Sequence, residues 1–187
     1  MQAQVLWRRL DTQGHDACRL SRDGDDWVLE GAAVAAEKHA LVSVSYRVVC
    51  GDDWVTKSAT VTGWSNEHNI SLEIVRDSDG VWHCNGIEAP LLGECTDIDL
   101  GFTPATNTCA VRRLQIDVGQ RRKATAAWLD DADWQLKPLQ QYYLRKAEFS
   151  YEYGSPAHGF TAQLTLDENG LVTEYPGVWT AESLDEL

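Results

Sequence analysis

Two acidic side chains, Asp97 and Asp99, stand one residue apart in the sequence Asp-Ile-Asp-Leu at 97–100. We expect this stretch to be a short strand, whose side chains alternate between two faces, so that both carboxylates share one face. Their Cα atoms would lie about 6–7 Å apart, near the carboxyl separation of glycosidases. One hypothesis is therefore a hydrolase of a small carbohydrate or lipid that uses these two acids.

A structural role for the same acids is the interpretation that we favour, because adjacent arginines, Arg112 and Arg113, follow them. Adjacent residues of a helix diverge by about 100°, so one arginine can flank the acids while the other faces elsewhere. An arginine enclosed by a sheet without a partner would be strongly destabilising. We interpret Asp97, Asp99 and Arg112 as structural ion pairs, and we predict no catalytic residue.

The sequence also lacks the motifs of serine hydrolases and of common metal sites. The nucleophile motif Gly-x-Ser-x-Gly is absent. His83 and Cys84 are adjacent, which in a strand places them on opposite faces, so they cannot share a metal ion. Without Cys-x-x-Cys spacing, the cysteines are predicted to be reduced thiols. No metal and no cofactor are expected. The five cysteines are Cys18, Cys50, Cys84, Cys95 and Cys109.

The elements that would hold these residues are mostly strands of period two, with turn signals such as Asp-Gly between them. Residues 32–40 fit either a strand or a turn. So many short strands must curl or close rather than form a flat sheet. The predicted strands are 5–9, 27–34, 41–49, 54–62, 70–76, 81–84, 97–100, 123–129, 134–145, 147–153, 160–166 and 171–175.

A single helix is predicted over about 106–118, after Pro104 interrupts the extended run. Its start offers side-chain oxygens for N-capping, from Thr106, Asn107 and Thr108. Its apolar residues recur at helical spacing, at Ala110, Val111, Leu114 and Val118. We therefore predict a mainly β fold, a many-stranded antiparallel sheet curled around one α-helix, in a single domain spanning 1–187.

Composition narrows the classes of partner. The 187 residues carry a formal net charge of −13, which would repel nucleic acid and an anionic bilayer surface. No apolar run approaches the roughly 18–20 residues that span a membrane, and the N-terminus does not resemble a secretory signal. We expect a cytoplasmic protein that is not membrane-embedded and does not bind nucleic acid.

The central stretch 97–114, DIDLGFTPATNTCAVRRL, resembles the signature of a bacterial family described as putative glycolipid-binding proteins. The likeness extends to Tyr46-x3-Cys50 with Trp54-x-Thr56, to Trp82 with Gly86 and Pro90, and to the ending Tyr175-Pro176-Gly177-x-Trp179. Cys109 and Ala110 depart from the family's usual Leu-Pro. The resemblance implies a spiral β-roll, similar in shape to periplasmic lipoprotein carriers that hold acyl chains.

The resemblance and the eight tryptophans favour a protein that binds a lipid or glycolipid and has no enzymatic activity. Aromatic rings could stack on a sugar face or an acyl chain. Two alternatives remain, the hydrolase above and a protein-interaction module that uses an exposed strand edge or Trp patch, for example as a homodimer. The predicted ligand contacts at the mouth of the roll are Trp82, His83, Arg113 and Tyr142.

Overall fold

The computed structural model describes residues 2–37 and 40–183, which form fifteen strands, one α-helix and two short 3-10 helices. The α-helix α1 covers Asn107–Leu114, and the 3-10 helices η1 and η2 cover Pro90–Leu92 and Pro156–His158. The strands are β1 (Ala3–Arg9), β2 (Gln13–Asp23), β3 (Asp26–Glu37), β4 (Ala40–Cys50), β5 (Thr56–Ser65), β6 (His68–Arg76), β7 (Trp82–Cys84), β8 (Ile87–Glu88), β9 (Asp97–Leu100), β10 (Arg121–Asp130), β11 (Gln135–Ala147), β12 (Ser150–Ser155), β13 (Phe160–Leu166), β14 (Val172–Tyr175) and β15 (Trp179–Ala181).

All fifteen strands join one continuous sheet, in the order β8-β7-β6-β5-β4-β3-β2-β1-β15-β14-β13-β12-β11-β10-β9. Every neighbouring pair is antiparallel except β9 and β10, which run parallel. The first and last strands pair with each other, Trp7 opposite Ala181, and this pairing joins the two halves of the chain. Each half otherwise follows the order of the sequence, because most connections are local hairpins.

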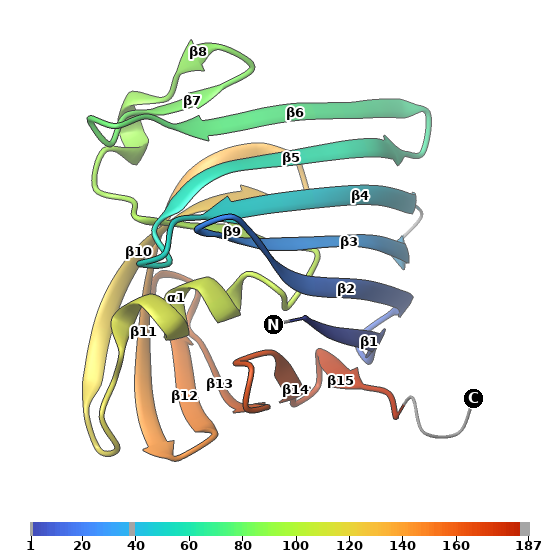
Figure 1. Cartoon of the computed structure of the whole chain (residues 1–187). Coiled ribbons are helices and arrows are strands. Elements are labelled where there is room, and N and C mark those ends of the chain that lie inside the picture. The colour runs from blue at the N-terminus through green and yellow to red at the C-terminus, as the bar shows by residue number, and fades with distance from the viewer. Residues whose placement is uncertain (1, 38–39, 184–187) are drawn as a thin grey trace.

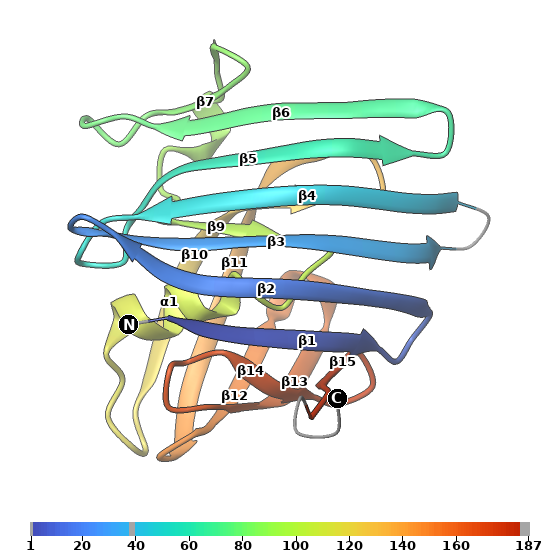
Figure 2. The ribbon, with the colours of Figure 1, turned by 45° about the vertical axis from the view of Figure 1, so that its right-hand side comes forward.

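The sheet curls into a roll (Figure 1). The long strands β1–β6 form one wall, and β10–β13 form a second wall that crosses it (Figures 1 and 2). The helix α1 lies in the concavity between them. The predicted fold class is therefore confirmed: a mainly β roll of antiparallel strands curled around a helix.

Period-two patterning identified the strands of this sheet well. In β4, for example, Val42, Val44, Tyr46 and Val48 are all buried, as alternation predicts. The ambiguous run 32–40 is strand as far as Glu37, and β4 begins at Ala40; residues 38 and 39 lie outside the described residues.

The helix is shorter than predicted. It ends at Leu114 because Gln115 adopts a left-handed conformation with φ 45°, which a continuing helix cannot contain. Val118, assigned to the apolar stripe from sequence, lies beyond this end and is exposed. No helix in residues 2–37 and 40–183 has the length and apolar character needed to cross a membrane.

The predicted N-capping by side chains is also wrong. Thr106 occupies the N-cap position, but its side chain makes no capping hydrogen bond. Its hydroxyl instead accepts a hydrogen bond of 3.1 Å from the backbone amide of Leu100, at the end of β9. The Thr108 hydroxyl donates to the Gly170 carbonyl at 2.9 Å. These oxygens therefore attach the helix start to β9 and to the turn between β13 and β14.

The core lies on both sides of α1. The side chains of residues 107–111 are all buried. Cys109 packs in the larger apolar cluster, which lines the β1–β6 wall, whereas Ala110 and Val111 pack in a smaller cluster with Tyr143 and Leu164 of the second wall. The two walls thus bury opposite faces of one short helix. An isolated helix this short would be unstable in water, so its stability must come from this burial.

Candidate functional site

The strand β9 is held at the inner edge of the roll, and this placement sets where its two acids point. Its backbone approaches β5, where the Thr56 hydroxyl accepts a hydrogen bond of 3.0 Å from the Ile98 amide. Ile98 and Leu100 face the apolar core. Asp97 and Asp99 therefore share the opposite face of the strand, as alternation predicts.

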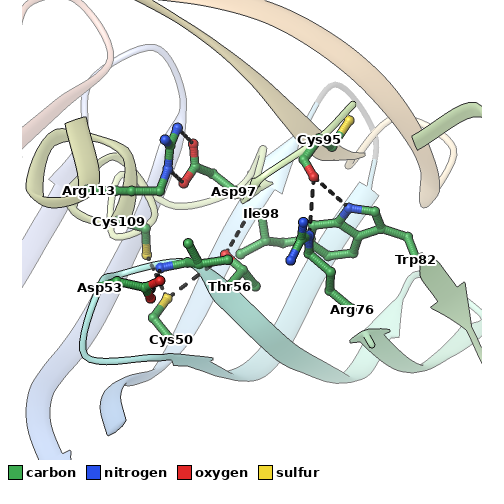
Figure 3. A network of polar contacts seen from close by, with 11 residues as sticks. Cys50, Asp53, Thr56, Arg76, Trp82, Cys95, Asp97, Ile98, Cys109 and Arg113 are labelled. Atoms are coloured by element: carbon green, nitrogen blue, oxygen red, sulfur yellow. Dashed lines mark hydrogen bonds and ion pairs between the residues drawn. The ribbon is translucent and has the colours of Figure 1, made fainter. Parts of the chain in front are cut away.

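Asp97 forms a bidentate ion pair with Arg113 of α1 (Figure 3). Nε and Nη2 of the arginine each lie 2.7 Å from a carboxylate oxygen of Asp97, whose side chain is only 1% exposed. The hydrogen bond to Asp97 raises the pKa of Arg113, so the guanidinium stays charged. The fork–fork geometry is the strongest form of this pair and fixes the helix against the strand.

Arg112 does not pair with either acid, so the sequence-based choice between the two arginines is corrected. Its Nε and Nη2 donate to the carbonyls of Asn169 and Glu168, at 2.9 and 2.8 Å. The reason is the 100° turn between adjacent helical residues, which directs Arg113 to β9 and Arg112 to the turn before β14. Arg112 thus stabilises a loop rather than a carboxylate.

Asp99 is likewise not in an ion pair within the described residues, which corrects the second part of that prediction. Its carboxylate accepts a hydrogen bond from the Gln141 amide, which also donates to the Tyr153 hydroxyl at 3.0 Å. Burial raises the pKa of Asp99 to about 6, the charge of Asp97 adds to this rise, and the Gln141 hydrogen bond opposes it. Asp99 therefore remains an acceptor with capacity for another donor.

Asp99 opens onto a cavity of about 290 Å³ between the start of α1 and strands β10–β15. Its polar lining also includes Thr103, Asn107 and Ser155. Tyr153, Phe160 and Tyr175 contact one another with ring centroids 6.1–6.2 Å apart. Such a combination of ring surfaces and few polar groups is typical of small-molecule sites. The aromatic lining consists of Trp128, Tyr153, His158, Phe160, Tyr175 and Trp179.

Asn107 lines this cavity and carries a buried acceptor that is unsatisfied. It is the first residue of α1 and is 6% exposed, and its side-chain oxygen has no hydrogen-bond partner among the described residues. An unpaired buried acceptor costs about 1–3 kcal/mol, so each one requires an explanation. A hydroxyl donor on a bound ligand would satisfy it.

A buried acid, Asp16, holds one of the residues that line the cavity, Thr103. The carboxylate of Asp16, on β2, accepts hydrogen bonds from the hydroxyls of Thr103 and Tyr46, the latter at 2.9 Å. The Thr103 hydroxyl also accepts a hydrogen bond of 3.0 Å from the Ala105 amide, so one side chain both orders the loop before α1 and joins it to β2. Burial raises the pKa of Asp16 to about 6, against these two hydrogen bonds.

A second, larger groove of about 1020 Å³ lies at the open end of the roll, between β4–β6 and the β10–β11 turn. Val42, Ile70, Leu72 and Trp134 provide its apolar surface. Phe102 packs on Trp134 at 5.7 Å while its neighbours Gly101 and Thr103 line the aromatic cavity, so one loop borders both hollows.

The four ligand contacts predicted from sequence do not converge. Trp82 is fully buried and donates to the Cys95 carbonyl at 3.0 Å (Figure 3). His83, the next residue of β7, points away from it. Tyr142 lies next to the inward-facing Gln141 and therefore on the outer face, where the Arg121 guanidinium covers its ring at 3.5 Å. Arg113 forms its ion pair with Asp97 and lies apart from Trp82 (Figure 3).

Sequence reasoning named only some of the residues that line the cavity. Asp99 and Asn107 were given other roles, Tyr175 and Trp179 entered through the family resemblance, and Trp128 was one of the tryptophans considered for ligand stacking. Their signal was weak because they come from separate strands. The Tyr175-Pro176-Gly177-x-Trp179 ending was the part of the pattern that marked this region. No group of three or more His, Cys, Asp or Glu side chains within residues 2–37 and 40–183 is placed to hold a metal ion.

Comparisons with known proteins agree with this architecture. The model of a family described as "Putative glycolipid-binding" matches residues 4–181. A solved structure of a DUF1089 family protein from Pseudomonas aeruginosa is similar, with a TM-score of 0.80 and 29% sequence identity, covering 89% of this chain and 91% of that one. A search of curated proteins gave no match.

Proposed function

Because the chain belongs to the family described as putative glycolipid-binding, we propose that it binds a glycolipid or a similar amphipathic ligand at the open end of the roll. The head group would occupy the aromatic cavity, and the hydrocarbon chain would lie along the larger groove. The observation that carries the proposal is an aromatic cavity lined by Asn107, whose side-chain oxygen has no hydrogen-bond partner among the described residues, in a roll that also has an apolar groove.

Two contacts between residues of the two hollows support this arrangement. Arg9 lines the groove, and its guanidinium lies 5.4 Å above the ring of Trp179, which lines the cavity. Phe102 provides a second link, because its ring contacts Trp134 of the groove while its neighbours Gly101 and Thr103 line the cavity. A ligand with a polar ring and a flexible tail could therefore contact both.

The paired-carboxylate hydrolase gains no support from the geometry. Both oxygens of Asp97 accept hydrogen bonds from Arg113, so Asp97 cannot act as the partner acid or base of Asp99. A binding role needs only the acceptors and ring surfaces that the cavity provides.

Native mass spectrometry of the freshly purified protein, followed by lipid extraction, tests the proposal. We expect a bound lipid, and we expect affinity for alkyl glucosides to rise with chain length. Ala132→Trp, on the exposed β10–β11 turn that borders the groove, should reduce the gain from chain length. Ala147→Trp, exposed and outside the groove, is the matched control. No bound lipid and no uptake of any alkyl glucoside would refute the proposal.

A further inference from the structure

The hydrogen-bonding groups of the aromatic cavity favour one chemical class of head group. Asn107 offers an amide oxygen without a hydrogen-bond partner among the described residues, and Asp99 offers a carboxylate that interacts with the Gln141 amide and the Thr106 hydroxyl. Both acceptors belong to residues that line the cavity. The Ser155 hydroxyl is already paired with His158, at 3.1 Å from its Nδ1.

The surroundings of the cavity disfavour an anionic head group. The nearby Arg9 guanidinium, over the Trp179 ring, is hydrogen-bonded to Asp11, and His158 in the lining is hydrogen-bonded to Ser155. No Lys or Arg is among its described lining residues. Lys137 lies 5.7 Å from the Trp128 ring, but its ammonium is bound by Asp130 and Asp133, at 2.6 and 2.7 Å. Arg113 is likewise bound by Asp97. A phosphate or sulfate would meet the Asp99 carboxylate without a counter-charge, which is unfavourable.

The aromatic surfaces and the volume of the cavity also favour a single sugar ring as the head group. Phe160, Tyr175 and Trp128 are partly exposed, and they present apolar surface of the kind that stacks on the C–H face of a sugar ring. A volume of about 290 Å³ is at the lower limit of ligand cavities, roughly 300–1,000 Å³. It suits a single ring rather than an oligosaccharide.

We infer that this cavity is a subsite for one uncharged pyranose ring, whose hydroxyls donate to Asn107 and Asp99 while its apolar face lies against the aromatic side chains. The inference rests on the proposed function and specifies its head group. It excludes lipids that carry a phosphate or sulfate head group from this subsite.

Isothermal titration calorimetry with octyl β-D-glucopyranoside and octyl sulfate, each below its critical micelle concentration, tests the inference. The two probes share a chain and differ in the head group. We expect the glucoside to bind at least tenfold more tightly than the sulfate. Equal affinities would overturn the sugar subsite and leave the proposed amphipathic ligand intact. Binding of neither probe would overturn both.

Variants locate the preference within the cavity. Asn107→Leu removes the unpaired oxygen, and we expect glucoside affinity to fall about tenfold with little change for the sulfate. If Asn107→Leu fails to fold, Phe160→Ser provides the same test from a side chain that is 37% exposed. Phe149→Ser, 43% exposed and outside the cavity, is its matched control. Glucoside affinity that is unchanged in Phe160→Ser, or equally reduced in both phenylalanine variants, would contradict the assignment.

Discussion

The two acids of β9 differ sharply in their surroundings, although they share one strand face and stand two positions apart. Asp97 lies at the junction with α1, where the arginine fork satisfies both of its oxygens (Figure 3). Asp99 faces the aromatic cavity with a neutral amide as its partner. The junction uses a polar pair to fix the helix, whereas the cavity leaves acceptors for a ligand.

Loss of the arginine fork gives the largest expected effect. Arg113→Ala leaves the Asp97 carboxylate buried without a partner, and removing one member of a buried pair typically costs about 3–5 kcal/mol. Urea unfolding at pH 7.5 measures this change in the free energy of unfolding. A loss below about 1 kcal/mol would show that the junction does not depend on the pair.

Asp16 should give the next largest effect, as a pH dependence of stability. Its pKa is about 6 in the fold against 3.8 for the ordinary group, so the folded state binds more protons between these values. The free energy of unfolding must then fall as pH rises from about 4 to about 6, by up to roughly 3 kcal/mol. Asp16→Asn should remove this contribution. An identical pH profile in both proteins would contradict it.

Asp99→Asn tests the contrast within β9 directly. The amide keeps an oxygen for Gln141 and removes a charge whose burial is unfavourable, so we expect stability at pH 7.5 equal to or higher than that of the native protein. Asp97→Asn should instead be strongly destabilising. Thermal melts of both variants measure the difference. Equal decreases in melting temperature would contradict the different roles assigned to Asp97 and Asp99.

The smallest effect is expected at the surface. Arg8 and Glu182 form an exposed ion pair at 2.9 Å between the chain ends. Such pairs contribute about 1 kcal/mol or less, so Arg8→Ala should change the free energy of unfolding little. Urea unfolding of Arg8→Ala and Arg113→Ala under the same conditions compares the two losses in free energy of unfolding. Comparable losses would mean that burial does not determine how much an ion pair contributes to stability.

Local patterning predicted the strands and the enclosed helix, but it failed where burial and polarity disagree. The strand β2 was not predicted, because its inward positions include Asp16 beside Cys18 and Leu20. An acid at an inward position hides the alternation of apolar residues on which the prediction depends. The buried hydroxyls of Thr103 and Tyr46 that stabilise Asp16 lie far away in sequence.

The candidate site could not be predicted from local sequence, because its residues are brought together by the tertiary structure. Choosing Arg113 over Arg112 requires the rotation of α1 about its axis, which both walls of the roll determine. The cavity gathers residues from β9 through β15, so its lining depends on strand register across half of the sheet. Residue spacing within one segment could not reveal that Asn107 and Phe160 border one volume.

A crystal structure of the protein with octyl β-D-glucopyranoside tests the central claim most directly. The account predicts electron density for one sugar ring in the aromatic cavity, with hydroxyls within hydrogen-bonding distance of Asn107 and Asp99 and with the octyl chain directed into the larger groove. A cavity without the sugar at saturating glucoside, or a sugar bound elsewhere on the roll, would contradict it.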